Sequence, residues 1–248
     1  MHEALFRRDI NEEPVESFST LVPARTVLAG TAVKLEPLDP AHHTAPLYRA
    51  GHGTEEALRS WRYLPWGPFS DEVALRDQLR NFAADLNRIF YAICDLATGE
   101  AVGMAAYLDI QPIGGVIEIG GIWFAPGFMR SRGATEALFL MLAYAMDDLG
   151  YRRMQWRCNA LNTASRNAAK RLGFRFEGIW HNHMIVKGRK RDTAWYSILD
   201  TEWPAIKAAI VAWLDPMNFN ADGVQQRPLS AMTAVLAIGA GVPWGVDA

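Results

Sequence analysis

Two arginines lie beside the predicted start of a helix, in the stretch Arg130-Ser131-Arg132-Gly133. An apolar run over 116–124 ends just before them at Ala125-Pro126-Gly127, because proline lacks the ladder N–H and glycine admits a tight turn. From Ala134 to Leu149, apolar residues recur at i, i+3, i+4 and i+7, which predicts a helix with one buried face. A helix start offers free backbone N–H groups and a positive dipole end, and guanidinium groups add charge. The stretch is therefore a candidate phosphate site, with an ordinary solvated loop as the alternative.

One carboxylate lies inside the preceding apolar run. Glu118 is flanked by Val116, Ile117, Ile119 and Ile122. Burying an ionised carboxylate is costly unless the group is paired, hydrogen-bonded or used in chemistry. Two interpretations stay open: Glu118 is a general base or water holder, or it belongs to a structural ion pair or hydrogen bond.

Two histidines stand two residues apart, at His181 and His183. In a regularly paired strand they would share one face. They could supply a base or bind a metal, but the sequence offers no third ligand near them, and we expect no metal site.

Aromatic residues and prolines crowd the loop from Trp61 to Phe69. Such a loop either plugs the core or lines a binding cleft, and the two roles are compatible. We take it as the wall on the side of the acceptor, with these residues as candidate substrate contacts: Trp61, Tyr63, Trp66 and Phe69.

Strands and helices alternate in a way that would position these groups. We predict strands over 31–38, 88–95, 101–110, 116–124, 153–158, 174–186 and 193–199, and helices from Asp39, over 54–62, 70–85, 134–149 and 163–172, and from Thr201 to Leu214. Short glycine-containing turns make the strands from 88 to 124 an antiparallel meander. The strand–helix–strand unit from 116 to 158 is a crossover, which makes its two strands parallel.

Length and composition bound the class of protein. The 248 residues are half apolar and about one fifth charged, as in a soluble globular protein, and the net charge of −2 gives no reason to expect nucleic acid as a partner. Cys94 and Cys158 fall in apolar runs without metal-type spacing, which indicates reduced core thiols and a cytoplasmic protein. The start of the chain has no secretory h-region, and glycines and a proline interrupt the apolar stretch 229–246, so we expect no membrane span. We divide the chain into an arm (1–28), a main domain (29–214) and a partly irregular tail (215–248).

The chain from about residue 30 to 214 resembles the GNAT superfamily of acyl-CoA-dependent N-acetyltransferases. It is most similar to the Rim-type enzymes that acetylate the N-termini of ribosomal proteins. The segments that carry the resemblance are Ala134-Thr-Glu-Ala-Leu138, Asn159-Ala-Leu-Asn-Thr-Ala-Ser165, Ala168-Ala-Lys-Arg-Leu-Gly-Phe-Arg-Phe-Glu-Gly178 and Arg191-Asp-Thr-Ala-Trp-Tyr-Ser197.

This resemblance implies an α/β (α+β) fold: a mixed, mostly antiparallel sheet of about seven strands, with one parallel pair and helices on both faces. It implies acetyl-CoA as cosubstrate, without a metal, and direct transfer to a primary amine, most readily a protein N-terminus. A small amine or antibiotic is the alternative acceptor, and a non-catalytic acyl-CoA-binding regulator is the alternative function. A homodimer stays open.

The family's phosphate signature, Gln/Arg-x-x-Gly-x-Gly/Ala, aligns with Met129, Arg132 and Ala134, so that arginine replaces the glycine. A register shifted by one places Arg130, Gly133 and Thr135 in the same slots. We favour the first register, in which the N–H groups of about 132–135 meet the pyrophosphate and Arg130 and Arg132 add charge.

The resemblance also implies roles around the thioester. The strands that begin at Val116 and Arg153 should splay apart for pantetheine, and N–H groups of Ile122, Trp123 and Phe124 should form an oxyanion hole. Glu118 is the candidate base, from its apolar surroundings. Ser165 matches the family's serine that donates to the leaving thiolate, or it bonds its own backbone at the start of the helix. Asn162 matches a cofactor-contacting asparagine and can also cap that helix. Tyr196 is a further candidate acid or a core residue, and Lys170 and Arg171 reach the CoA phosphates or face solvent. Some Rim-type relatives carry a carboxylate where this chain has Met184, which favours His183 as a second candidate base.

Overall fold

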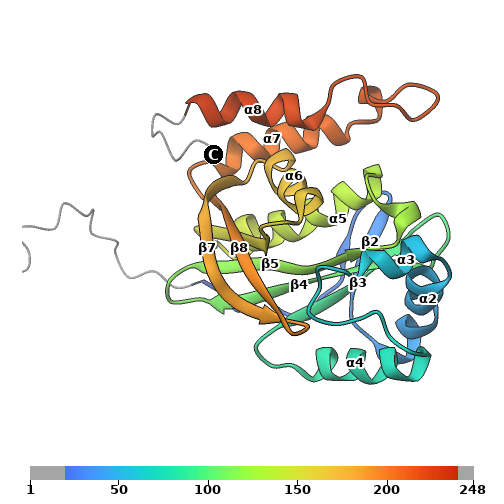
Figure 1. Ribbon diagram of the computed structural model, residues 1–248. Helices are drawn as coiled ribbons and strands as arrows, with labels where there is room; N and C mark the ends of the chain where they lie inside the picture. Colours follow the sequence, from blue (N-terminus) through green and yellow to red (C-terminus); the bar gives the residue numbers. More distant parts are fainter. Residues whose placement is uncertain (1–19, 240–248) are drawn as a thin grey trace, which may run out of the picture.

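The computed structural model describes residues 20–239, in which one central sheet carries helices on both faces (Figure 1). The strands are β1 (Leu28–Ala29), β2 (Val33–Pro37), β3 (Ile89–Asp95), β4 (Ala101–Gln111), β5 (Val116–Phe124), β6 (Arg153–Asn159), β7 (Arg175–Val186) and β8 (Arg189–Leu199). The α-helices are α2 (Pro40–His52), α3 (Glu55–Ser60), α4 (Glu72–Ala84), α5 (Arg132–Ala143), α6 (Thr163–Arg171), α7 (Trp203–Leu214) and α8 (Leu229–Gly239). Two 3-10 turns, η1 (Pro126–Phe128) and η3 (Pro216–Asn218), and a π-helical turn, η2 (Tyr144–Asp148), complete the set. Residues 1–19 of the predicted arm and 240–248 of the predicted tail lie outside the described residues.

The sheet has the strand order β1-β2-β3-β4-β5-β6-β8-β7. Neighbouring strands are antiparallel except for β5 and β6, which are parallel because the chain crosses over through α5 between them. The predicted fold class is confirmed. The strand beyond the predicted seven is the short β1, which pairs with β2 at the junction of the predicted arm and domain.

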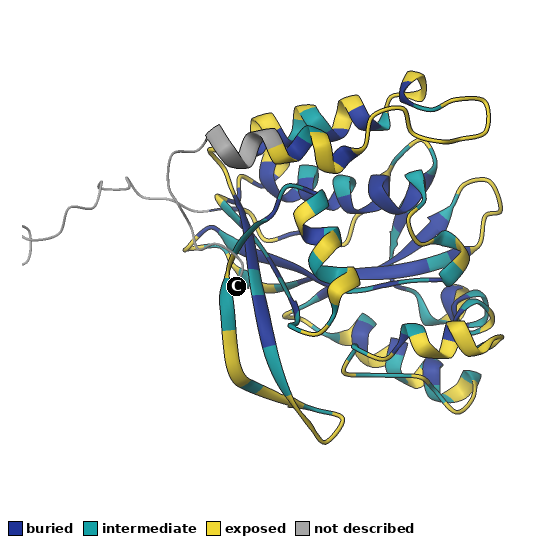
Figure 2. Ribbon diagram, turned by 45° about the horizontal axis from the view of Figure 1, so that its top comes forward, coloured by how far each residue is buried: buried dark blue, intermediate teal, exposed yellow. Residues whose placement is uncertain are grey.

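Each face of the sheet has its own hydrophobic core. Helices α5, α6, α7 and α8 cover one face, where Met141, Trp156 and Ile210 are among the buried residues. Helices α2, α3 and α4 cover the other face over strands β3 to β5, with Leu47 and Phe82 in that core. Among the described residues, this second core contains none from β6, β7 or β8. The second face is therefore without a helical layer over these three strands, and Figure 2 shows the outer end of the β7–β8 hairpin exposed.

The parallel pair opens after three residues. Pairing runs from Val116 with Arg153 to Glu118 with Gln155, and no later pair joins β5 to β6 among the described residues. On the other side of β5, Gly121 and Ile122 bulge opposite Ala105, and Gly121 has a φ of +59°. The predicted splay of the two strands is thus confirmed, and Gly120-Gly121 marks a bulge, as its sequence indicates.

The chain after α7 folds back as α8 along α7 and α6, next to the first core. Leu229 is fully buried, and the Thr233 hydroxyl donates to the carbonyl oxygen of Arg171 at 3.2 Å. Asn218 supports the intervening loop by donating to the carbonyl oxygens of Trp213 and Arg227. The sequence did not predict α8. Within the described residues, no helix is long and apolar enough to span a membrane.

Candidate active site

The gap beyond the β5–β6 pair exposes backbone N–H groups of β5. Ala125 N–H donates to the carbonyl oxygen of Val102 at 2.8 Å, so antiparallel alternation directs the N–H of Trp123 toward β4 as well. The N–H of Phe124 then lies on the opposite edge, toward the gap. This geometry supplies one donor of the kind an oxyanion hole needs, next to the bulged Ile122.

The side chain of Trp123 has a structural role on the second face. Its Nε1 donates to Ser60 Oγ at 2.7 Å, and its ring stacks on Trp61 with 4.5 Å between centroids. Of the three residues predicted around the oxyanion, Trp123 is thus tied into the core by its side chain.

The predicted phosphate loop is a turn followed by a helix N-terminus. Ser131 is the N-cap of α5, and its Oγ accepts from Ala134 N–H at 2.9 Å, so the helix begins at Arg132, earlier than the apolar pattern suggests. The N–H groups of Arg132 and Gly133 have no hydrogen-bond partner among the described residues. Arg130 precedes them with a φ of +62° and an exposed side chain. These features match what a pyrophosphate requires.

Arginine at position 132, in place of the family's glycine, creates no backbone strain. Arg132 is the first residue of α5 and lacks a positive φ, which instead falls at Arg130. Its guanidinium donates to the carbonyl oxygen of Leu214 and lies 5.3 Å from the ring centroid of Phe219. Arg132 thus connects the loop to the carboxyl end of α7, while the exposed Arg130 keeps its charge available.

Gly133 is needed for packing. A Cβ at this residue would lie 2.6 Å from the ring of Phe128 and 3.1 Å from Val33. The Met129 side chain is exposed, and its N–H donates to the carbonyl oxygen of Ala125, which fixes the turn.

The start of α6 holds two more of the predicted site residues. Asn162 is the N-cap, as predicted, and its Oδ1 accepts from Ser165 N–H at 3.2 Å. Ser165 Oγ accepts from Trp156 Nε1 at 3.1 Å, and Ser165 also hydrogen-bonds the side chain of the buried Cys158.

Arg171 joins the end of α6 to the start of α5. Its Nη2 donates to Thr135 Oγ1 at 2.6 Å, and its guanidinium lies 5.2 Å from the ring centroid of Trp213. Burial lowers the pKa of Arg171. The side chain of Thr135 is therefore occupied, and its N–H, like that of Ala134, is engaged by Ser131.

Glu118 is buried at the point where the parallel pairing ends. Its carboxylate is 2 % exposed, and Arg157 Nε lies 2.7 Å from Oε2, with Asp109 Oδ2 2.7 Å from Nη2 of the same arginine. The approach of Arg157 lacks hydrogen-bond alignment, so Oε2 has no hydrogen-bond partner among the described residues. Burial raises the pKa of Glu118 to about 8, Arg157 opposes this rise, and the nearby Asp109 adds to it. Glu118 Oε2 therefore forms an ion pair with Arg157 but has no aligned hydrogen bond among the described residues.

The strand carrying the two histidines is irregular, which corrects the expectation of a shared face. Residues 181–183 bulge opposite Asp192, and Asn182 has a φ of +52°. Asp192 accepts from Asn182 N–H at 2.7 Å and lies 3.0 Å from Nδ1 of the exposed His181. His183 is half-buried, 3.0 Å from Thr193 Oγ1, and burial followed by the charges of arginines 157 and 191 lowers its pKa. Of the two histidines, only His183 lies close enough to Arg157 and Arg191 for their charges to lower its pKa.

Tyr196 is fully buried in β8. Its hydroxyl accepts from Arg166 Nε at 3.0 Å, and its ring packs on Phe176. The phenol is thus held in the first core beside α6.

The aromatic loop packs into the core, as one of its two proposed roles predicts, and its role as the acceptor wall stays a prediction. Trp61 is fully buried, and its Nε1 donates to the carbonyl oxygen of Gly51 at 2.9 Å, so it plugs the second core together with the ring of Phe69. Trp66 is half-buried, and its ring lies 3.6 Å from where a Cβ of Gly121 would be. Tyr63 reaches further, donating from its hydroxyl to the carbonyl oxygen of Leu161 at 3.1 Å.

The hairpin turn also contacts this loop. Lys187 Nζ donates to the carbonyl oxygen of Trp61 at 3.0 Å, and burial lowers the lysine's pKa. The aromatic loop therefore joins the β6–α6 loop and the β7–β8 hairpin.

Sequence reasoning missed Arg157 and Asp109. A signal existed for Arg157, because strand alternation places it on the face opposite Trp156, where the partner strand presents Glu118. For Asp109 the sequence held no such signal. Its positive φ of +43° interrupts the regular alternation at the end of β4, so its direction cannot be predicted from the strand pattern.

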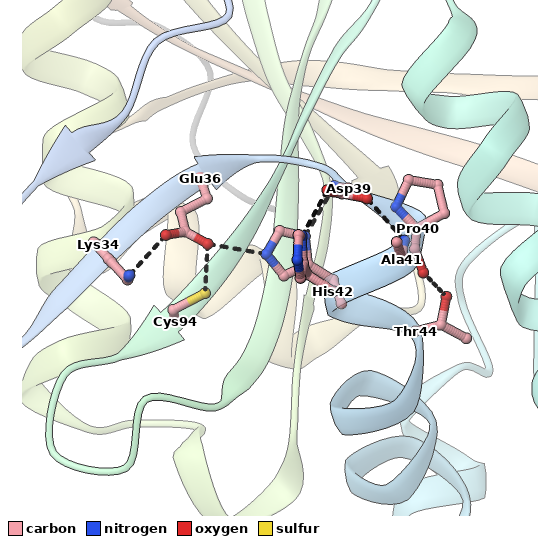
Figure 3. Close-up of polar contacts among 9 residues, drawn as sticks. Lys34, Glu36, Asp39, Pro40, Ala41, His42, Thr44 and Cys94 are labelled. Carbon is pink, nitrogen blue, oxygen red and sulfur yellow. Dashed lines mark hydrogen bonds and ion pairs between the residues drawn. The ribbon is translucent and has the colours of Figure 1, made fainter.

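A separate group on β2, α2 and β3 has metal-type ligand atoms. Glu36, His43 and Cys94 place one each within 4.8 Å of the others, and Figure 3 shows the carboxylate of Glu36 between Lys34 and Cys94. His43 Nδ1 accepts from Asp39 N–H at 2.9 Å, so the ring proton lies on Nε2, 3.0 Å from Glu36. A metal at Nε2 would displace this proton to Nδ1, against the Asp39 N–H. We assign the group a structural role at the start of α2.

Comparison with known proteins adds independent information. The family model described as acetyltransferase (GNAT) domain matches residues 33–175. "Putative ribosomal N-acetyltransferase YdaF" of Bacillus subtilis (strain 168) is 29% identical over 157 residues, which cover 62% of this chain and 84% of that protein.

Solved structures agree with this match. A GCN5-related N-acetyltransferase from Brucella melitensis superposes with a TM-score of 0.85 at 42% identity, over 88% of this chain and 98% of that chain. The RimL ribosomal L7/L12 alpha-N-protein acetyltransferase superposes with a TM-score of 0.60 at 20% identity, over 75% of this chain and 98% of that chain, and shares the fold.

Proposed function

The chain belongs to the GNAT acetyltransferase family, and we propose that it transfers the acetyl group of acetyl-CoA directly to the N-terminal amine of a protein, such as a ribosomal protein. Glu118 carries this proposal. Its carboxylate is buried where the two parallel strands separate, and its Oε2, although 2.7 Å from Arg157 Nε, has no aligned hydrogen bond among the described residues. A buried polar atom of this kind calls for an explanation, and a reacting amine supplies one.

Glu118 acts as the general base in this proposal. A pKa of about 8 lies close to the range of about 7.7–8.0 for an α-amino group, so the proton transfers between groups of similar basicity. A lysine amine, near about 10.4, would need a stronger base. His183 is the second candidate base, since its lowered pKa keeps the imidazole neutral at physiological pH.

In the reaction, the neutral amine attacks the thioester carbonyl carbon and forms a tetrahedral intermediate. The N–H of Phe124 faces the developing oxyanion, and Glu118 takes the proton that the nitrogen loses. The C–S bond then breaks, the Ser165 hydroxyl donates a hydrogen bond to the leaving thiolate, and the thiolate takes its proton from solvent. Tyr196 is the less accessible donor, since it is fully buried with its hydroxyl beside Arg166.

The CoA pyrophosphate is assigned to the start of α5. Within residues 20–239 the N–H groups of Arg132 and Gly133 have no hydrogen-bond partner, and Arg130 is an exposed cation beside them. Arg171, at the end of α6, donates to Thr135 of α5, and Asn162, at the other end of α6, is the second cofactor contact in this proposal. The exposed Met129 forms the outer side of the turn.

The choice of a protein N-terminus is supported by the relatives. The B. subtilis relative is described as a putative ribosomal N-acetyltransferase, and the chain covers 84% of that protein. The acceptor enters on the face where β6, β7 and β8 lack a helical layer, beside Trp66 and Tyr63 of the aromatic loop.

Thiol release from acetyl-CoA tests the proposal. The acceptors are ribosomal-protein N-terminal peptides, the same peptides with a blocked N-terminus and a free lysine, and a panel of small amines. Turnover of the unblocked peptides, and loss of turnover on blocking, is the expected result. Faster turnover of a small amine would reject the protein acceptor, and tight CoA binding without turnover of any amine would reject the enzyme.

A further inference from the structure

Buried polar atoms without partners concentrate around the proposed acceptor site. Five buried side-chain atoms lack a hydrogen-bond partner among the described residues, and one of these belongs to Tyr151, just before β6. The other four are Glu118 Oε2, Trp66 Nε1, Arg191 Nε and Trp195 Nε1. Three of the four are donors. Since buried donors are nearly always satisfied in folded proteins, this concentration indicates a ligand that brings acceptor oxygens.

Arg191 is the most unusual of the four. It is half-buried, its Nε is fully buried, and it forms no ion pair with a carboxylate among the described residues. The carboxylates of Glu118 and Asp109 approach Arg157 instead. An unpaired guanidinium inside a protein is costly, so its retention here favours a bound anion.

Trp195 connects Arg191 to an open pocket. Both lie on the same face of β8, because they are four residues apart and side chains alternate between the two faces of a strand. The centroid of the Trp195 ring lies 5.3 Å from the guanidinium carbon of Arg157. Trp195 and Trp180 line a pocket of about 290 Å³, with Asp109 and Gln155 on its far side. Trp180 is 55 % exposed, so this pocket opens to solvent.

Local charge limits the ligand to a single negative charge. Arg157 and Arg191 contribute two positive charges, and Asp109 contributes one negative charge. Glu118 and the acceptor amine share one proton, so the two together are neutral whichever group holds it. His183 is neutral at physiological pH because burial and the two arginines lower its pKa, and the ion pair of Arg153 with Glu177 cancels. One positive charge remains, which a carboxylate balances and a phosphate dianion would exceed.

We propose that Arg191 and the indole N–H of Trp195 bind a carboxylate carried by the amine acceptor, next to the amine that Glu118 deprotonates. This inference rests on the proposed acetyltransferase function and narrows its substrate class. Arg191 and Trp195 are specificity-determining residues here, since they hold the acceptor and take no proton. The carboxylate belongs to a free α-amino acid or to an acidic side chain close to a peptide N-terminus.

Binding of acetylated products tests the proposal without requiring turnover. N-acetylalanine is compared with N-acetylalaninamide, and the acetylated dipeptide amide Ser-Asp with Ser-Asn, each titrated against the CoA-saturated protein by calorimetry. Wild-type protein should prefer the carboxylate in at least one pair by about 10- to 100-fold, the range of a charged hydrogen bond. The preferred pair identifies the source of the carboxylate.

Substitutions then test whether Arg191 and Trp195 cause the preference for the carboxylate. Arg191→Gln should reduce it to within about twofold, and Trp195→Phe should reduce it partly, by about three- to tenfold, because only a neutral donor is removed. Arg189→Gln is the matched control, because Arg189 is an exposed arginine on the same hairpin and should retain the full preference. If Arg191→Gln does not fold, the loss of carboxylate preference in Trp195→Phe still tests the proposed site.

Two results would overturn the inference: equal affinity for carboxylate and carboxamide in both pairs, or no saturable binding of either carboxylate. An equal loss of preference in Arg189→Gln would also reject Arg191 as the specific contact. Failure of the proposed function gives a different result. If the protein prefers the carboxylate but acetylates no amine, the proposed anion site is supported and the proposed acetyltransferase activity is rejected.

Discussion

Replacing Glu118 by glutamine keeps the shape of the side chain and removes its ability to ionise. In the folded protein the carboxyl is 2 % exposed, and burial raises its pKa to about 8 from an ordinary value of 4.5, with Arg157 opposing and Asp109 assisting the rise. The folded state therefore holds the proton more tightly than the unfolded state does. As the pH rises from about 4.5 through about 8, wild-type protein must lose stability through this group, and the glutamine variant must not.

The size of the effect follows from the shift. A difference of 8 − 4.5 = 3.5 pKa units, at about 1.36 kcal/mol each, sets a ceiling of about 5 kcal/mol on the stability that ionising Glu118 removes above pH 8. Near pH 5 the protonated carboxyl and the amide are nearly equivalent, so the two proteins should differ little. The advantage of Glu118→Gln should then grow by at least about 1 kcal/mol toward pH 9.

Urea unfolding followed by tryptophan fluorescence measures this difference across the pH range. Glu177→Gln is the matched control, since Glu177 lies on the neighbouring part of the sheet with a pKa lowered, against the effect of burial, by Arg153 and Ser197. Glu177 is ionised in both states above pH 6, so its variant should differ from wild type by a constant amount there.

The same Glu118→Gln variant should lose about 10²–10⁴-fold in kcat, the range for a general base, with little change in the affinity for CoA. A stability difference that stays constant or shrinks as the pH rises would refute the burial of a protonated Glu118. A kcat within a few-fold of wild type would refute its role as base and favour His183.

Three further changes have defined outcomes. Gly133→Ala should lower the urea midpoint, because the new Cβ would meet the Phe128 ring at 2.6 Å and overpacking costs about 1–3 kcal/mol; an unchanged or higher midpoint would show that the ring yields freely. Trp66→Ala should raise the KM of the acceptor more than the KM of acetyl-CoA in steady-state assays, and equal effects would remove Trp66 from the acceptor wall. Ser165→Ala should lower kcat at an unchanged KM for acetyl-CoA and destabilise the fold by about 1 kcal/mol, since Trp156 Nε1 loses its acceptor; an unchanged kcat would exclude the hydroxyl as the donor to the thiolate.

Local signals in the sequence were sufficient for most of the fold. Apolar periodicity and glycine turns located the strands, the Asn162 cap fixed the start of α6, and Gly120-Gly121 indicated the bulge at the opening of the sheet. These features depend on a few residues that are neighbours in the sequence, so a local pattern is enough to predict them.

Features that depend on distant contacts were harder to predict. α8 is stable because Leu229 and Thr233 pack on α6 and α7, and its isolated sequence lacks polar–apolar periodicity. The bulge at Asn182 is held by Asp192 from the partner strand, which a regular alternation cannot anticipate.

The site itself was predicted in part. Glu118 stood out because a carboxylate in an apolar run needs a reason, but the arginine that approaches it comes from a strand 39 residues later, after the crossover. Arg191 was noticed only as part of a family pattern, since nothing in its sequence neighbours shows that it lacks a carboxylate partner.

The contact from Arg132 to the carbonyl oxygen of Leu214 has a consequence for synthesis on the ribosome. The two residues are 82 positions apart, and a chain elongates at about 5–20 residues per second, so about 4–16 s pass between them. During this interval the turn before α5 exists without the anchor that α7 later provides. The nascent protein can fold the helices and strands of its amino-terminal half early, but the turn before α5 gains this anchor only after residue 214 has been made.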